Sequence, residues 1–190
     1  MNKSNSLFKK FKYSPIKNSY NCIFSSNIQK SKGIFEIVES INNLNKVGKE
    51  TYFLDLYGYI FDKLVFKKES CINYKGKLDY FNRLEVMSTY DFLILASETE
   101  GLPMILLECM AIGLPFITTK VGAIEELLGE NYPYYCKKNT FSIMEKINHL
   151  VDDYKKNNIK KIVLANRKKI IDFYTNENYK KNLKKLIYKI

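Results

Sequence analysis

The chain has 190 residues, 46% of them hydrophobic, and carries a formal net charge of +11. This length allows one well-buried core and is cramped for two, so we expect a single folded domain. No apolar run approaches the roughly 20 residues of a membrane-spanning helix, and the lysine-bearing start has no apolar signal-peptide region. These features argue against a helical membrane protein. They favour a cytoplasmic one, and a peripheral position at the inner face of a membrane stays open.

The positive charge gathers toward both ends of the chain, where lysines dominate. This distribution suits anionic partners, namely nucleotide phosphates, nucleic acid or a lipid surface. A lysine- and asparagine-rich composition without a specific partner explains it equally well. The four cysteines are far apart and form no CxxC pair, so we expect them to be reduced core residues: Cys22, Cys71, Cys109 and Cys136.

Strand and helix patterns alternate along most of the chain. Residues 1–20 are polar and without a pattern, and we interpret them as a lead-in or linker. Apolar runs predict strands over 21–27, 52–60, 71–75, 91–97, 115–120 and 132–136. Helical periodicity predicts helices over 32–46, 62–67, 79–87, from 103 onward, 123–128 and 140–154. This alternation predicts a doubly wound, Rossmann-like α/β domain with a mainly parallel sheet, whose ligand site lies at the carboxyl ends of the strands.

The stretch from Asp91 to Leu128 is the most informative part of the sequence. A continuously apolar strand ends near Ser97, and Pro103 suits the first turn of the helix that follows. Glu108 stands in the middle of that otherwise apolar helix, and Glu100 precedes it by eight positions. Burying an unpaired carboxylate costs several kcal/mol, so Glu108 should either point out of the core or meet hydrogen-bond donors.

A short polar loop, IQKSKG, joins the first strand to the first helix and contains Lys30, Lys32 and Gly33. Free backbone amides, the positive end of the helix dipole and the lysines suit a phosphate there. An ordinary solvated loop explains an isolated KSKG at least as well.

The polar residues that follow the predicted strands should meet at one rim of the sheet. Lysines and helix amides there can hold a diphosphate, and carboxylates can accept hydrogen bonds from sugar and ribose hydroxyls, as a nucleotide sugar requires. Metal binding has less support, because Glu100 and Glu108 lack a neighbouring histidine or aspartate cluster. His149, the only histidine, falls on a helix outside this rim, which favours a structural or surface role.

The segment EGLPMILLECMAIGLPFITTKVGAIEE resembles the donor-site signature of family 4 retaining glycosyltransferases of the GT-B type, with Glu100 and Glu108 as their E-x7-E pair. SNIQKSKG resembles the loop that opens their C-terminal domain, and NYKGKL resembles their third-strand turn. The resemblance covers roughly residues 21–172. It implies that 21–157 form a nucleotide-sugar-binding domain, half of a GT-B fold.

The resemblance also implies roles for individual residues. Glu100 would contact hydroxyls of the donor sugar, Glu108 would contact the ribose, and Lys32 would neutralise the diphosphate, so that Glu100 and Lys32 carry the catalysis. The other donor-binding positions that it implies are Asn27, Gly33, Gly76, Lys77, Leu78, Gly101, Leu102, Pro103, Gly122 and Glu126. Among them, 76–78 would line the base pocket, 101–103 would shape the loop near the sugar, and Glu126 would match the acidic residue closing the second loop.

Two departures from the family pattern concern the donor site. Asn27 stands where many relatives have an arginine five positions before the lysine, and Gly122 is followed by Ala123 instead of a second glycine. A third departure is larger, because the N-terminal acceptor domain of a GT-B enzyme has no counterpart here.

The implied activity is therefore a retaining, metal-independent hexosyl or glycosyl transfer that needs no cofactor beyond the nucleotide-diphosphate sugar. It would also need a missing acceptor domain or a partner polypeptide. The alternative is a non-catalytic nucleotide-sugar-binding module, or a basic module that binds nucleic acid or membranes. Nucleic acid has less support because no RNA- or DNA-reading motif is found.

The last segment, 158–190, is basic and has a helical pattern. One face of its final helix would gather Tyr179, Leu183, Leu186, Ile187 and Ile190, with lysines on the other faces. We favour C-terminal helices that pack on the domain or on a partner. Binding of the basic amphipathic helix to an anionic membrane is the alternative.

Overall fold

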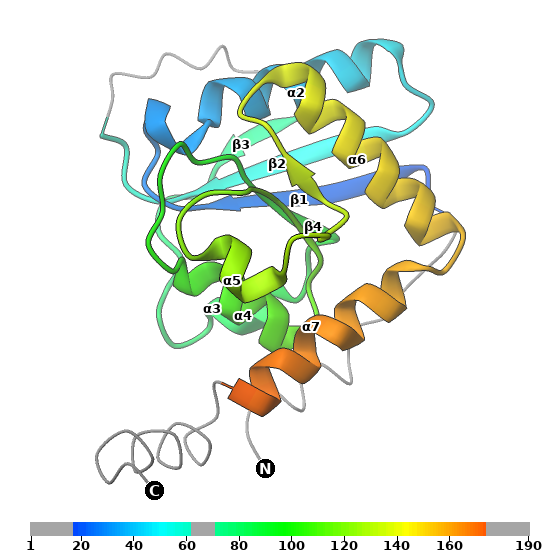
Figure 1. Ribbon diagram of the computed structural model, residues 1–190. Helices are drawn as coiled ribbons and strands as arrows, with labels where there is room; N and C mark the ends of the chain where they lie inside the picture. The colour runs from blue at the N-terminus through cyan, green and yellow to red at the C-terminus, as the bar shows by residue number, and fades with distance from the viewer. Residues whose placement is uncertain (1–16, 62–70, 174–190) are drawn as a thin grey trace, which may run out of the picture.

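A computed structural model describes residues 17–61 and 71–173 of the chain (Figure 1). Over these residues, six strands form one sheet in the order β3-β2-β1-β4-β5-β6, and all neighbouring strands are parallel. The strands are β1 (Ser19–Ser25), β2 (Thr51–Tyr57), β3 (Ile72–Tyr74), β4 (Phe92–Leu95), β5 (Phe116–Thr119) and β6 (Tyr135–Cys136). The predicted doubly wound α/β fold with a parallel sheet is confirmed.

Helices cover both faces of the sheet. The helices are η1 (Lys30–Lys32), a 3-10 turn, and the α-helices α2 (Ile34–Val47), α3 (Arg83–Met87), α4 (Met104–Ile112), α5 (Ile124–Leu128), α6 (Thr140–Lys155) and α7 (Ile159–Phe173). α2 packs beside α6 on one face, and α4 packs beside α7 on the other, where α3 and α5 also lie (Figure 1). Along the described ranges, no helix combines the length and the apolar composition needed to cross a membrane.

The central strands are apolar because helices bury them from both sides. Every residue of β4 and β5 is buried, including the polar Thr118 and Thr119. Tyrosine hydroxyls tie the helical layer and the loops to the strands, since Tyr154 donates to the carbonyl oxygen of Asp91 and Tyr132 to that of Phe116. The core is therefore continuous through the sheet, and functional side chains are confined to its rim.

The strand order reverses between β1 and β4, which are neighbours in the sheet. In open α/β sheets, the loops after two such strands diverge and leave a crevice at their carboxyl ends. Here the loop after β1 also packs against the end of β4. The amide of Glu98 donates to the carbonyl oxygen of Ser31 at 2.8 Å, and Gly33 lies against Ala96.

Several predicted boundaries are wrong. The predicted helix 32–46 divides into η1 and α2, because Gly33 adopts a left-handed backbone with φ of 72° between them. The predicted strand 52–60 stops at Tyr57, before Gly58 with φ of 145°. The predicted helix 79–87 is helical only from Arg83, and of the predicted strand 132–136 only Tyr135 and Cys136 are strand.

The remaining elements agree with their predicted positions to within a few residues. β1 lies two residues earlier than predicted, and β3, β4 and β5 are shorter by two or three residues. α4 begins one residue after Pro103, α5 begins one residue late and α6 ends one residue late. The predicted helix 62–67, residues 1–16 of the predicted lead-in 1–20 and the final amphipathic helix after 173 lie outside the described residues. The end of the lead-in was predicted wrongly, because Ser19 and Tyr20 belong to β1.

The cysteines are free thiols, as predicted. Cys22, Cys109 and Cys136 are buried, and burial raises the pKa of each thiol. Cys71 is only half-buried, so its assignment to the core is wrong. It precedes the short strand β3, which lies at the edge of the sheet and whose residues are half-buried or exposed.

We predict that Gly33→Ala destabilises the protein by about 2 to 4 kcal/mol. The new methyl group would lie 2.3 Å from the carbonyl oxygen of Ala96, on a backbone with positive φ. Gly101→Ala is the matched control, because no atom lies within 4 Å of its added Cβ and its φ is not positive. The control should stay within about 0.5 kcal/mol of the parent. Urea unfolding measures both, and equal stabilities of the two variants would contradict the prediction.

Candidate functional site

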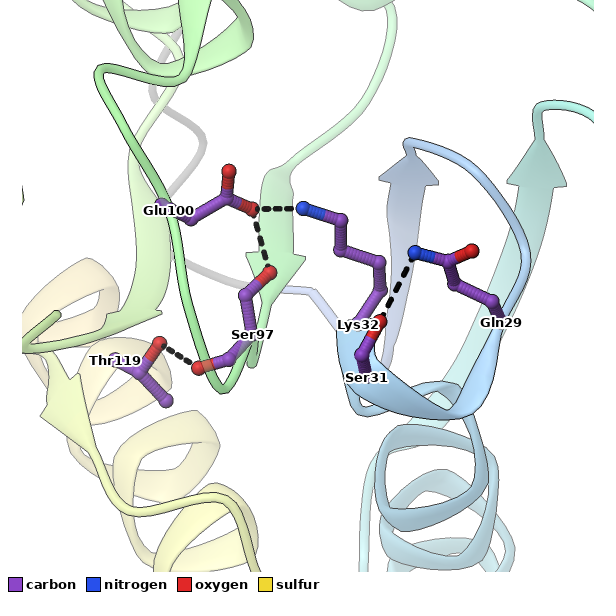
Figure 2. A network of polar contacts seen from close by, with 6 residues as sticks. All are labelled: Gln29, Ser31, Lys32, Ser97, Glu100 and Thr119. Carbon is purple, nitrogen blue, oxygen red and sulfur yellow. Dashed lines mark hydrogen bonds and ion pairs between the residues drawn. The ribbon is translucent and has the colours of Figure 1, made fainter. Parts of the chain in front are cut away.

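Lys32 and Glu100 form an ion pair at the rim of the sheet, with 2.8 Å between Nζ and Oε1 (Figure 2). Lys32 ends the turn after β1, and Glu100 lies in the loop after β4, so the pair bridges the two loops at the reversal of strand order. Their side chains are only 17% and 11% exposed. The structure therefore brings together the two residues predicted to carry catalysis.

Two hydroxyl groups fix the orientation of Glu100 through successive hydrogen bonds. The Ser97 hydroxyl donates to Oε1 of Glu100 at 2.6 Å, and the Thr119 hydroxyl donates to the carbonyl oxygen of Ser97 at 2.7 Å (Figure 2). On the other side of the ion pair, Gln29 donates to the hydroxyl of Ser31 at 2.9 Å. One carboxylate oxygen of Glu100 thus has two donors within the protein, which fixes its orientation.

Gly122 permits the loop after β5 to pack directly on the loop after β4. Its φ is 56°, and a Cβ there would lie 1.7 Å from the carbonyl oxygen of Glu100. The amide of Ala123 donates to the carbonyl oxygen of Gly101 at 3.3 Å. Gly122 therefore fixes the backbone of Glu100, whereas its contact with a donor stays a prediction.

A cavity of about 410 Å³ opens at the same rim, between the ends of β1, β2 and β3 and helix α4. Four of the predicted donor-binding residues line it: Asn27, Lys77, Leu78 and Glu108. Eight further lining residues were not predicted: Ser25, Ser26, Tyr57, Gly58, Tyr59, Arg83, Met104 and Ile105. The volume falls within the range of small-molecule sites.

Glu108 meets a cation in this cavity. Arg83, in the first turn of α3, pairs with Oε1 of Glu108, whose side chain is 14% exposed. Burial raises the pKa of the Glu108 carboxyl above its ordinary value, although the charge and the hydrogen bond of Arg83 act in the opposite direction. The sequence predicted that Glu108 either points out of the core or meets hydrogen-bond donors, and the second alternative holds. It did not identify Arg83, whose one distinguishing signal is that it is one of only two arginines in the chain.

A second cation at the cavity contacts an aromatic ring. The Lys77 ammonium lies 3.6 Å from the ring centroid of Tyr59, and both residues are exposed. Lys77 follows β3 and Tyr59 follows β2, so this contact joins two neighbouring loops of the rim. Gly76, with φ of 77°, turns the chain between β3 and Lys77 and accepts a hydrogen bond from the amide of Gly58.

The other predicted positions do not line the cavity. Leu102 is 38% exposed in the loop before α4, and Pro103 is the capping residue that precedes that helix. Glu126 is exposed on α5 and does not line the cavity. His149 is exposed on α6, where Nε2 lies 3.5 Å from a carboxylate oxygen of Asp153, in keeping with the predicted surface role. Across residues 17–61 and 71–173, no three His, Cys, Asp or Glu side chains gather in a group that could hold a metal ion.

The sequence profile of glycosyl transferases group 1 matches residues 6–162, which is most of the chain. The chain belongs to the family of glycosyl transferases group 1. This membership favours a glycosyltransferase over the alternative of a nucleic-acid- or membrane-binding module.

The matches to individual relatives cover different shares of this chain. The N-acetyl-alpha-D-glucosaminyl L-malate synthase of Bacillus anthracis is 40% identical over 60 residues, which are 32% of this chain and 15% of that protein. A glycosyltransferase from Rickettsia africae ESF-5 superposes with a TM-score of 0.76 and 23% identity, over 97% of this chain and 52% of that one. The chain thus spans about half the length of the Rickettsia protein.

One solved structure corresponds to a single domain. The C-terminal domain of the glycosyl transferase group 1 family protein LpcC from Francisella tularensis superposes with a TM-score of 0.68 and 24% identity, over 83% of this chain and 87% of that domain. The predicted likeness to the C-terminal half of a GT-B glycosyltransferase is confirmed. Assignment to family 4 and retention of stereochemistry stay predictions.

We predict that Lys32 and Glu100 are energetically coupled by about 1 to 2 kcal/mol. Lys32→Met leaves a mostly buried carboxylate without its cation, so it should destabilise the protein more than the double variant Lys32→Met/Glu100→Gln does. The control cycle uses Lys120 and Glu125, whose side chains are 37% and 51% exposed and should couple by at most about 0.5 kcal/mol. Urea unfolding of all variants gives both energies. Equal coupling in the two cycles would contradict the prediction.

Proposed function

We propose that the rim binds a nucleotide-diphosphate sugar and that the chain supplies the donor-binding half of a glycosyltransferase. The observation that carries the proposal is that Glu100 and Glu108 each pair with a cation from another element, Lys32 and Arg83, at the rim of the sheet. Glu108 and Arg83 also line the cavity of about 410 Å³. Family membership and the likeness to a C-terminal domain support it.

The proposed pose follows the order of the groups along the rim. Glu108 lines the cavity after β1, β2 and β3, and it accepts hydrogen bonds from ribose hydroxyls, with the base toward Lys77 and Leu78. The diphosphate lies between Lys32 and the start of α4, whose first turn contains no acidic residue. The helix amides and the lysine then share its charge.

Donor binding exchanges the partners of Glu100 and Lys32. In the ligand-free protein the two residues neutralise each other at 2.8 Å. With a donor present, Lys32 turns to the diphosphate and Glu100 accepts hydrogen bonds from the sugar, while Ser97 continues to hold its Oε1 atom. The internal ion pair keeps both groups ordered in the absence of ligand, which reduces the entropy lost on binding.

The proposed reaction is transfer of the glycosyl group with retention. The bond between the anomeric carbon and the diphosphate oxygen breaks, and an acceptor hydroxyl forms a new bond to that carbon from the same face. The proton of the hydroxyl passes to the departing diphosphate oxygen. Negative charge grows on the leaving diphosphate, where Lys32 and the α4 amides stabilise it. This arrangement requires no metal ion and no cofactor besides the nucleotide sugar.

The acceptor side of the reaction lies outside the part of the fold described here. Because this chain spans about half the length of the Rickettsia relative, we propose that a second domain or a partner polypeptide supplies the acceptor site. A cytoplasmic location belongs to the same proposal. Contact of the basic C-terminal residues with an anionic membrane surface stays the alternative to their packing on the domain or on a partner.

A binding panel tests the donor site. Isothermal titration with the uridine, guanosine, adenosine and thymidine diphosphate sugars should identify at least one that binds. Glu108→Ala and Lys32→Ala should each weaken that binding by about tenfold or more, because each removes a charge-assisted contact. Glu145→Ala, at an exposed position on α6, is the control and should leave the affinity unchanged. Absence of binding to all four, or a Glu108→Ala variant equal to the parent, would refute the proposal.

Chelation tests the metal-free part separately. If Lys32 and the α4 amides neutralise the diphosphate, the donor affinity should change by less than about twofold between excess EDTA and millimolar Mg²⁺. A metal-dependent site would bind at least about tenfold more weakly in EDTA, because the cation would bridge the phosphates. Titration of the parent under both conditions distinguishes these outcomes.

A further inference from the structure

Arg83 is the charged side chain of the cavity to which the proposed donor contacts give no role. Its guanidinium pairs with Oε1 of Glu108, and its Cζ atom lies 4.4 Å from the ring centroid of Tyr80. The Arg83 side chain is 30% exposed, against 14% for Glu108. A cation on α3 is thus stacked on a ring of the preceding loop and directed at a carboxylate on α4.

The chemistry of this contact is specific to arginine. A guanidinium can stack on a ring with its face and donate to a carboxylate with its edge, whereas a lysine ammonium is a point charge on a flexible stem. The chain has 31 basic residues, yet only two are arginines. The other cation at the cavity, Lys77, contacts the Tyr59 ring instead.

Burial and Arg83 act on the charge of Glu108 in opposite directions. Burial raises the pKa of its carboxyl, and Arg83 is the group that lowers it. Of the other titratable side chains around it, Lys77, Tyr57 and Tyr59 line the same cavity, and the buried Cys109 follows on α4. Loss of Arg83 would leave burial unopposed, so the carboxyl would be protonated at a higher pH than in the parent.

We propose that Arg83 is a positioning residue for donor binding, which keeps Glu108 charged and oriented by pairing with Oε1 so that Oε2 can accept hydrogen bonds from the ribose. Tyr80 holds the guanidinium in that position. This inference rests on the proposed donor site. It adds Arg83, which lies on α3 and acts on the ligand only through Glu108, to the residues of that site.

The first experiment needs no ligand. A ¹³C NMR titration follows the Glu108 carboxyl in the parent, Arg83→Lys and Arg83→Met, with Glu108→Gln assigning the signal. The carboxyl pKa should rise by at least about one unit in Arg83→Met and by less in Arg83→Lys, which retains the charge. Lys155→Met is the matched control, because it also removes a cation from an ion pair, with Glu50, away from the cavity. An unchanged Glu108 pKa in Arg83→Met would overturn the inference.

The second experiment measures binding of the nucleoside diphosphate that the parent binds best, from the uridine, guanosine, adenosine and thymidine 5′-diphosphates. Arg83→Met should weaken binding by about tenfold at mildly acidic pH, and the loss should shrink as the pH rises and Glu108 ionises. In a Glu108→Gln background, Arg83→Met should have no further effect. A loss that is equal at every pH, or that persists in Glu108→Gln, would overturn the inference.

The two experiments also separate this inference from the donor site itself. If the parent binds none of the four diphosphates, the donor site is refuted and the ligand role of Arg83 with it. If the parent binds and Glu108→Ala weakens binding while the Arg83 variants behave as the parent, the donor site stands and only the inference fails.

Discussion

The backbones of three rim loops pack so closely that glycine is needed between them. Gly33 places the loop after β1 against Ala96 at the end of β4, and Gly122 places the loop after β5 against the carbonyl oxygen of Glu100. A side chain at either position would overlap backbone atoms that belong to another loop. The positions of Lys32 and Glu100 follow from these contacts, because each adjoins or touches one of the two glycines.

Two partly buried ion pairs lie at the rim. Lys32 with Glu100 links the loops after β1 and β4, and Arg83 with Glu108 links α3 to α4. Such pairs add little net stability, since desolvation offsets most of the attraction, but removing one partner is costly. They are better understood as a way to keep two carboxylates ordered and accessible at one edge of a sheet.

At Glu108, the charged form that suits ligand binding is the form that lowers the free energy of unfolding. Its folded-state pKa is raised, so its contribution to the free energy of unfolding is fully present below the ordinary carboxyl pKa and is lost as the pH rises through the folded value. Ionisation of Glu108 therefore costs stability. The same ionisation makes the carboxylate a hydrogen-bond acceptor, and Arg83 reduces the cost. A protein under selection for stability alone would replace both residues with apolar ones.

The sequence by itself determined the fold class and the edge of the sheet at which the polar residues after the strands gather. It also showed that Glu108 must either point out of the core or meet hydrogen-bond donors. Continuous apolar runs mark strands that are buried on both faces, their alternation with helices makes the sheet parallel, and a parallel sheet brings the strand ends to one edge. The segment from Glu100 to Glu126 also carried enough of the family signature to identify the C-terminal half of a GT-B glycosyltransferase.

Only the tertiary structure decided which charged residues pair with each other. Lys32 and Glu100 are 68 positions apart, and Arg83 reaches Glu108 from another helix, so no local pattern could pair them. The short helix α3 begins only at Arg83, because tertiary packing rather than helix propensity sets where such a short element starts. Local periodicity fixes which face of an element is buried, whereas the partner of a polar side chain depends on how distant loops meet in the folded chain.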